Sequence, residues 1–172
     1  PNFFLASLGK MTARETIKYN HILLHAASIL IKNKAILITG RPGSGKSTTL
    51  RKLVPPYLPI SDDQVVVGST KKGLVAYPSP FNSKIDLSKT KNTGYPIIGV
   101  IISAKNQKLG LTKVPAPEAL GILLNETLLA ISNKKVAKKV LNIVSPLSHR
   151  TFILSHQIHD NILDAINSQF RK

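Results

Sequence analysis

The residue spacing best suited to chemistry lies between Gly40 and Thr48. The segment reads Gly40-Arg41-Pro42-Gly43-Ser44-Gly45-Lys46-Ser47-Thr48 and fits the pattern G-x-x-x-x-G-K-[ST] at every fixed position. In this pattern the glycines let backbone N–H groups approach an anion, Lys46 reaches the β and γ phosphates, and the Ser47 hydroxyl is offered to Mg²⁺. An apolar run precedes the segment and a helical pattern follows it, so the positive end of a helix adds to anion binding. The segment predicts a site for nucleotide phosphates.

Two adjacent carboxylates, Asp62 and Asp63, are the leading acidic candidates in a chain with only eight Asp and Glu residues. A phosphate-loop enzyme uses a carboxylate to hold Mg²⁺, and a kinase also uses one to orient the attacking hydroxyl and accept its proton. Because side chains alternate along a strand, both carboxylates can face one site only at a bulge or a strand end. The alternative is that the pair caps a turn or a helix.

Histidines and arginines supply the other candidates. His25 precedes the glycine-rich segment and reaches it if the two flanking runs form a hairpin; its alternative role is that of a hydrogen-bonded core residue. Arg41 and Arg150 are candidates for binding transition-state charge, because a guanidinium can contact two phosphate oxygens. The spacing of His156 and His159 suits a metal, but no third ligand follows, so we interpret both as solvated residues near a helix start.

The charge of the chain points to an acidic partner. The net charge is +16 and is spread along the sequence, a balance that favours nucleotides, acidic peptides, nucleic acid or an anionic membrane as partners. Four lysines at 134, 135, 138 and 139 form a basic face at helical spacing, which we interpret as solvated, with an acidic partner as the alternative. Five Phe and four Tyr offer little stacking surface, and no nucleic-acid motif is present. The absence of cysteine and of an eighteen-residue apolar run favours a cytoplasmic protein without a membrane span.

Hydrophobic periodicity predicts one α/β domain over residues 1–172. Strands are predicted at 21–31, 35–39, 61–67, 74–77, 97–104, 109–114 and 151–154, and helices at 45–53, 118–132, 134–144 and 161–170. A hairpin turn is expected at Lys32-Asn33-Lys34. The helix at 118–132 is apolar nearly all round and is expected to be buried, and Pro146 is expected to end the next helix. The segment 78–96 is the candidate for a long functional loop.

Several of these residues resemble a known family. Leu24-His25, the antiparallel strand and phosphate loop after it, and Ser61-Asp62-Asp63 at the next strand resemble the C-terminal kinase domain of the HPr kinase/phosphorylase family. The resemblance covers residues 21–67 and continues loosely to the C-terminus, where Tyr77-Pro78-Ser79-Pro80-Phe81 resembles a Gly-Thr-Pro-Phe segment. It implies the mixed, largely antiparallel sheet of the phosphoenolpyruvate-carboxykinase-like kinases, with a helix after the phosphate loop and further helices near the C-terminus.

The resemblance also implies a function, the ATP- and Mg²⁺-dependent transfer of a γ-phosphoryl group to a serine or similar hydroxyl of a protein, peptide or small molecule. Its catalytic residues would be His25, Lys46, Asp62 and Asp63, and Ser47 with the two aspartates would hold the metal. Which aspartate is the base stays open, and so does assembly into a homo-oligomer, which relatives form. The chain lacks the Glu-Val-Arg-Gly-like segment of bifunctional members, so whether it has a reverse phosphorylase activity stays open. The alternative function is a nucleotide-binding regulatory or nucleic-acid-binding module without phosphotransfer.

Overall fold

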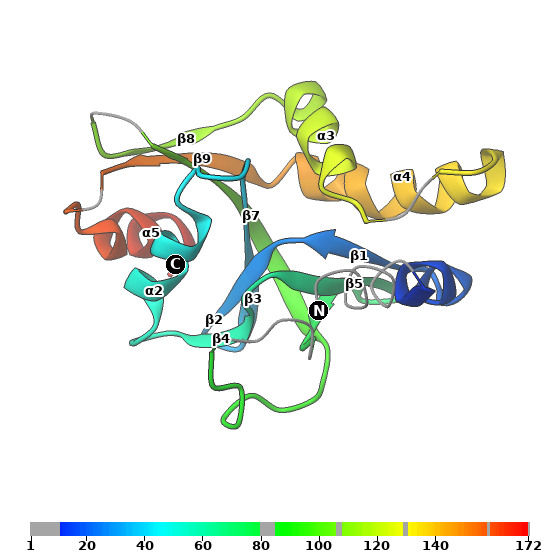
Figure 1. The fold of residues 1–172 in the computed structure, drawn as a ribbon, viewed down its shortest axis with the longest axis horizontal. Helices are drawn as coiled ribbons and strands as arrows, with labels where there is room; N and C mark the ends of the chain where they lie inside the picture. The colour runs from blue at the N-terminus through cyan, green and yellow to red at the C-terminus, as the bar shows by residue number, and fades with distance from the viewer. Residues whose placement is uncertain (1–10, 80–84, 106–107, 129–130, 158, 172) are drawn as a thin grey trace.

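A computed structural model describes residues 11–79, 85–105, 108–128, 131–157 and 159–171. Its strands are β1 (His21–His25), β2 (Ala27–Ile31), β3 (Lys34–Thr39), β4 (Leu58–Ser61), β5 (Gln64–Thr70), β6 (Gly73–Tyr77), β7 (Tyr95–Lys105), β8 (Gly110–Lys113) and β9 (Thr151–His156). Its helices are the 3₁₀ turn η1 (Ile17–Tyr19), α2 (Lys46–Leu53), α3 (Ala116–Asn125), α4 (Lys134–Ser148) and α5 (Ile162–Phe170). Figure 1 shows their arrangement.

The central strand of the sheet is β7, which is long enough to serve three neighbours. It runs parallel to β3 along one edge, and along the other edge it pairs first with β6 and then, in parallel, with β9. The strand order is β1-β5-β6-β7-β3-β2-β4, with β9 and then β8 branching from β7. Among the described strands only the β3–β7 and β7–β9 pairs are parallel, so the predicted mixed and largely antiparallel sheet is confirmed.

The strand predicted at 21–31 is in fact two strands. β1 ends at His25 and pairs with β5, whereas β2 begins at Ala27 and pairs with β3. The chain turns at Ala26, whose N–H donates to the carbonyl of Leu24 over 3.0 Å. The hairpin between β2 and β3 is confirmed, and its two-residue turn has positive φ at Lys32 (48°) and Asn33 (61°), the backbone that a tight hairpin turn requires.

Both faces of the sheet are covered, which explains why its central strands are apolar throughout. Successive side chains of β3 point to opposite faces: Ala35 and Leu37 join a core with α3 and α4, and Ile36 and Ile38 join a core with α2 and α5. In Figure 1 α2 and α5 lie together on one side of the sheet, and α3 and α4 lie together on the other. The strands that carry the candidate residues are therefore held firmly from both sides.

Two helix predictions are wrong in their extent. The helix predicted at 118–132 ends at Asn125 instead, because the backbone at Glu126 to Leu128 leaves the helix and pairs with β1. It is not buried all round: Ala119 and Leu123 are buried, and Gly121 is exposed.

Pro146 does not end the next helix but lies inside α4, which continues to Ser148. A proline in a helix interior leaves the carbonyl four residues earlier without its N–H donor. That carbonyl belongs to Asn142, and both Asn142 and Pro146 are exposed, so water can take the donor's place. Burial of Leu147, which is 1% exposed, holds the last turn against the core.

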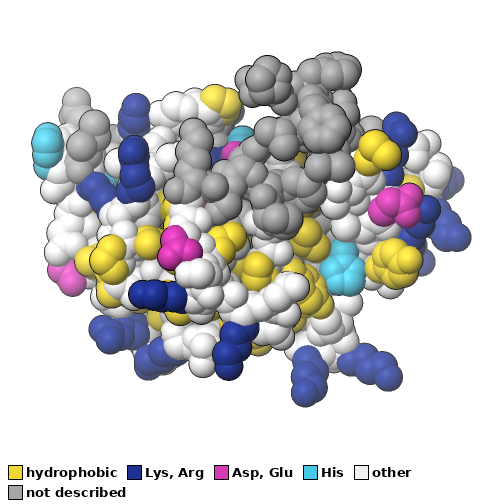
Figure 2. All heavy atoms as spheres, turned by 60° about the horizontal axis from the view of Figure 1, so that its bottom comes forward, with side chains coloured by type: hydrophobic (Ala, Val, Ile, Leu, Met, Phe, Trp, Pro, Cys, Tyr) yellow, Lys and Arg dark blue, Asp and Glu magenta, His cyan; other side chains and the backbone are white. Residues whose placement is uncertain are grey.

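The surface carries its positive charge broadly. Figure 2 shows Lys and Arg side chains across the width of one face, interspersed with few Asp and Glu. Among the described helices none is long and apolar enough to cross a membrane.

Candidate active site at the carboxyl edge of the parallel strands

The three parallel strands β3, β7 and β9 end beside one another, at Thr39, Lys105 and His156. The carboxyl edge of parallel strands is where α/β proteins most often bind ligands. A cavity of about 470 Å³ opens at this edge. Its walls are formed by the glycine-rich turn, the first residues of α2, the ends of β1, β7 and β9, and the residue before β5. The lining residues are His25, Gly40, Arg41, Pro42, Gly43, Gly45, Lys46, Ser47, Thr48, Asp63, Lys105 and His156.

The turn between β3 and α2 needs its glycines. Gly40, Gly43 and Gly45 have φ values of 149°, 80° and 98°, a backbone region that residues with a Cβ rarely adopt. A Cβ on Gly40 would also lie 2.8 Å from the carbonyl oxygen of Ser103, so the turn passes close over β7. After Gly45 the chain enters α2 at Lys46, and the cavity therefore lies at the amino end of a helix.

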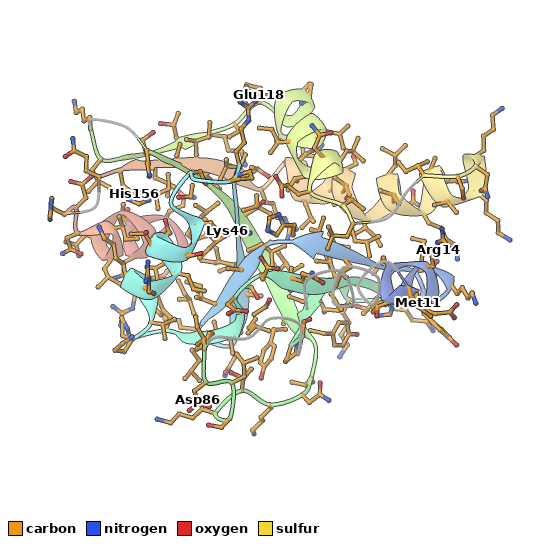
Figure 3. The ribbon with its side chains drawn as sticks, viewed as in Figure 1. Met11, Arg14, Lys46, Asp86, Glu118 and His156 are labelled. Atoms are coloured by element: carbon orange, nitrogen blue, oxygen red, sulfur yellow. The ribbon has the colours of Figure 1, made fainter. Side chains whose placement is uncertain are left out.

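A buried network of polar side chains from α2, β7 and β9 contacts this turn. Thr49 Oγ1 lies 2.9 Å from Ser103 Oγ and 2.8 Å from His156 Nε2, and Ser103 Oγ donates to the carbonyl of Ser44 over 3.2 Å. All three of Thr49, Ser103 and His156 are at most 2% exposed. The network ties the first turn of α2 to the ends of β7 and β9; Lys46 and His156, which lie at the start of α2 and the end of β9, are labelled in Figure 3.

Three charged groups meet on the other wall of the cavity. His25 Nε2 lies 3.1 Å from Asp63 Oδ1 and 2.6 Å from Lys46 Nζ, and Lys46 Nζ is 3.7 Å from the same Asp63 oxygen. Antiparallel pairing of His25 with Gln64 brings Asp63 alongside the histidine, and Thr39 Oγ1 donates to the His25 carbonyl over 3.1 Å. A second carboxylate contacts the ring from the opposite side, with Glu126 Oε2 at 3.2 Å from Nδ1.

The two carboxylates decide the charge of the histidine. Hydrogen bonds to Asp63 and then to Glu126 raise the pKa of His25 to about 9, although burial and Lys46 act in the opposite direction. A ring with this pKa is protonated at neutral pH, so Nε2 donates to Asp63. In the charged ring Nε2 carries a hydrogen and has no free lone pair, so it accepts a hydrogen bond from Lys46 only when the ring is neutral. Burial lowers the pKa of Lys46, and the nearby Asp63 and Glu126 oppose that shift.

Most of the residues predicted for the site come together in the structure. His25, Lys46, Ser47, Thr48, Asp63 and the turn from Gly40 to Gly45, apart from Ser44, line this cavity. Ser44 lines a second cavity of about 450 Å³, which shares residues 40–43 with the first and has Ile102, Ala104 and Ile122 in its walls. Asp62 is not among the lining residues, although its charge acts on Lys46.

Three other predicted features lie elsewhere. Arg150 is at the amino end of β9, where Nη1 donates to the Ile97 carbonyl over 3.0 Å, so it does not reach the cavity. His159 is likewise not among the lining residues. The described residues 85–94 of the predicted functional loop lead into the amino end of β7, and none of them lines the cavity, while residues 80–84, with Pro80 and Phe81, lie outside the described part of the chain.

Three residues of the site were not found from the sequence. His156, interpreted above as solvated, is 2% exposed and hydrogen-bonded, and Lys105 lines the cavity. Both stand at the carboxyl end of a predicted strand, a position that could have singled them out. Glu126 gave no such signal, because it fell inside a predicted helix. Among the described residues, no group of three or more His, Cys, Asp and Glu is placed to hold a metal ion.

Comparisons with known proteins name a family for the chain. A solved structure described as the Hpr(Ser) kinase/phosphatase from Coxiella burnetii is similar at a TM-score of 0.46 and 17% identity, over 87% of this chain and 93% of that chain. No curated protein matches the sequence. A family model described as SynChlorMet cassette protein ScmC matches residues 5–163, which is most of the chain. The family model therefore does not assign the chain to the HPr kinases, and the chain belongs to the ScmC family.

Proposed function

We propose that the protein binds ATP with Mg²⁺ and transfers the γ-phosphoryl group to a hydroxyl acceptor. The observation that carries this proposal is the meeting of the glycine-rich turn, Lys46 and the His25–Asp63 pair in one cavity. The turn is a binding element for phosphates, and the pair adds a carboxylate that a site for phosphate binding alone does not need.

The residues of the turn fit a nucleotide. Lys46 and Arg41 line the cavity and would neutralise phosphate oxygens, and the amino end of α2 adds its partial positive charge. The second cavity has apolar walls from Ile102, Ala104 and Ile122, which suit the flat face of a base. When bound, ATP supplies the phosphoryl group, and Mg²⁺ neutralises the charge that develops during its transfer.

The residues present also fit Mg²⁺. This ion takes oxygen ligands and is usually held by one or two carboxylates together with substrate phosphates and water. Ser47 is exposed at the start of α2, and Ser47 and Asp63 both line the cavity. Ser47 and Asp63 would hold the ion directly or through water, and Asp62 would add its charge from just outside the cavity wall.

For the acceptor, the structure favours Asp63 over Asp62 as the base. Asp63 lines the cavity and is oriented by His25, so its carboxylate can accept a hydrogen bond from a bound hydroxyl. As the acceptor oxygen forms its bond to phosphorus and the bond to the leaving phosphate breaks, the hydroxyl proton passes to Asp63. The acceptor would be a serine or similar hydroxyl of a protein, a peptide or a small molecule, and Arg41, Lys46 and Lys105 favour an acidic one.

Phosphotransfer can be tested without knowing the acceptor. The full chain is incubated with γ-labelled ATP, Mg²⁺ and an extract of the source cells, and labelled products are identified by mass spectrometry, with Asp63→Asn as the inactive control. We expect a product that gains one phosphoryl group with the wild type only. Saturable ATP binding without any labelled product or ADP would instead support the alternative, a nucleotide-binding regulatory module.

A further inference from the structure

Glu126 lies at the end of α3, and nothing in its sequence surroundings marks it as functional. In the fold its side chain is only 14% exposed and points at His25, with Oε2 at 3.2 Å from Nδ1. A carboxylate that is mostly removed from water needs a hydrogen-bond donor, and the imidazole N–H is the donor that it meets.

The backbone of Glu126 is bound to the same histidine. The His25 N–H donates to the Glu126 carbonyl over 2.8 Å, and the Leu128 N–H donates to the Leu23 carbonyl over 2.9 Å. Between these bonds, Thr127 forms an antiparallel bridge with Leu24. The segment after α3 thus extends the sheet beside β1, and it fixes the position from which the Glu126 side chain reaches the ring.

The contact at Nδ1 determines what the other ring nitrogen can do. An ionised carboxylate only accepts hydrogen bonds, so Nδ1 must carry a hydrogen to bond with Glu126, whether the ring is charged or neutral. Nε2 is then the nitrogen that faces the cavity, where Asp63 Oδ1 is 3.1 Å away and Lys46 Nζ 2.6 Å away. Without Glu126 the ring could turn about its own axis or carry its hydrogen on Nε2 alone.

We propose that Glu126 is a positioning residue, which keeps a hydrogen on Nδ1 of His25 and thereby presents Nε2 to the cavity, where it donates to Asp63 in the charged ring and accepts from Lys46 in the neutral ring. A carboxylate that fixes the tautomer and orientation of a histidine is a recurring device in active sites. The kinetic consequence of this role rests on the proposed phosphotransfer, because the residue acts through His25 on Asp63. Its structural consequence, the state of the ring, does not.

The first experiment measures which ring nitrogen of His25 carries hydrogen. In ¹⁵N-labelled full-length protein, long-range ¹H–¹⁵N correlations report which nitrogen of His25 carries hydrogen, measured above the pH at which the ring loses its charge. We expect hydrogen on Nδ1 in the wild type and in Glu126→Gln, whose amide oxygen still accepts, and hydrogen on Nε2 in Glu126→Ala. A wild-type ring with hydrogen on Nε2, or an unchanged ring in Glu126→Ala, overturns the proposal.

The second experiment measures kcat and KM for ATP. Glu126→Ala should lower kcat about 10- to 100-fold while KM for ATP changes less than about 3-fold, and Glu126→Gln should recover most of the loss. Glu118→Ala is the matched control, since Glu118 is exposed on α3, away from Lys46 (Figure 3). Full kcat in Glu126→Ala contradicts the proposal. If the wild type transfers no phosphate, the proposed function fails, and the ring measurement still decides the role of Glu126.

Discussion

His25 Nε2 and Asp63 Oδ1 lie 3.1 Å apart although 38 residues separate them in the chain. The pairing of β1 with β5 brings the two residues together. From β1 the chain continues through the hairpin of β2 and β3 into the glycine-rich turn, which leads to Lys46. A generic phosphate-binding turn thereby acquires a carboxylate whose orientation is fixed by a histidine. The predictions that follow test this arrangement and the elements that support it.

Asp63→Asn should remove most turnover and spare nucleotide binding. An amide cannot accept the hydroxyl proton, so kcat should fall by about 10²- to 10⁴-fold, while the affinity for ATP measured without Mg²⁺ stays within a few-fold. Asp62→Asn is the matched variant, and because Asp62 does not line the cavity its effect on kcat should stay below about 10-fold. A larger loss in Asp62→Asn than in Asp63→Asn would reverse the assignment of the base.

His25 should stabilise the fold in a way that depends on pH. The pKa of His25 is about 9 in the folded protein, against 6.5 for a free imidazole. A raised pKa means that the folded state binds the proton more tightly, so this stabilisation is complete below about pH 6.5 and is lost as pH rises through about 9. The difference in unfolding free energy between wild type and His25→Asn should therefore shrink from about pH 6 to about pH 10. His149→Asn, at an exposed site, is the control, and a difference that grows with pH would show the wrong sign.

Thr49→Val should destabilise the protein and loosen the turn above it. The substitution keeps the shape of the side chain but removes the 2.8 Å hydrogen bond of His156 Nε2 and leaves that nitrogen with Ser103 Oγ at 3.3 Å, a loss of about 1–3 kcal/mol in a buried place. Faster amide exchange at Ser44 and Gly45 should accompany it. Thr112→Val on β8 is the control, because Thr112 is exposed, and equal stability losses in both variants would mean that the buried network contributes nothing.

Pro146→Ala should stabilise α4. Alanine restores the N–H that the helix lacks and has a higher helix propensity, so the free energy of unfolding should rise by about 1–2 kcal/mol. Pro117→Ala serves as the comparison, because Pro117 lies in the first turn of α3, where a missing N–H leaves no helix bond unmade. Denaturant midpoints measure both variants, and a lower midpoint for Pro146→Ala would mean that the proline fits this helix better than alanine.

Local patterns were sufficient to predict much of the fold. The hairpin at Lys32 and Asn33, the helix from Lys46 to Leu53 and the last strand and helix all follow from periodicity and turn residues acting over short distances. The helix end predicted at Pro146 is wrong because burial of Leu147 stabilises the last turn of α4 by more than the proline destabilises it. The phosphoenolpyruvate-carboxykinase-like assignment stays a prediction.

The candidate site could be predicted only in part, for a physical reason. His25, Lys46 and Asp63 lie close to a recognisable motif, so their proximity could be inferred from two expected strands. Glu126 and His156 reach the site through pairings between distant parts of the chain, β1 with the segment after α3 and β7 with β9. No local pattern encodes these pairings. Glu126 therefore had no signal in the sequence, whereas His156 had one in its position at the end of a predicted strand.

The most direct test of the central claim is a calorimetric titration of ATP and Mg²⁺ into the wild type, Lys46→Ala and Arg51→Ala. Lys46 is the cation of the cavity wall at the start of α2, and Arg51 is an exposed cation near the end of the same helix. Loss of charged hydrogen bonds to phosphate should weaken binding by at least about 10-fold in Lys46→Ala, with Arg51→Ala unchanged. Absence of binding to the wild type, or equal affinity in all three proteins, would contradict a nucleotide site at this turn.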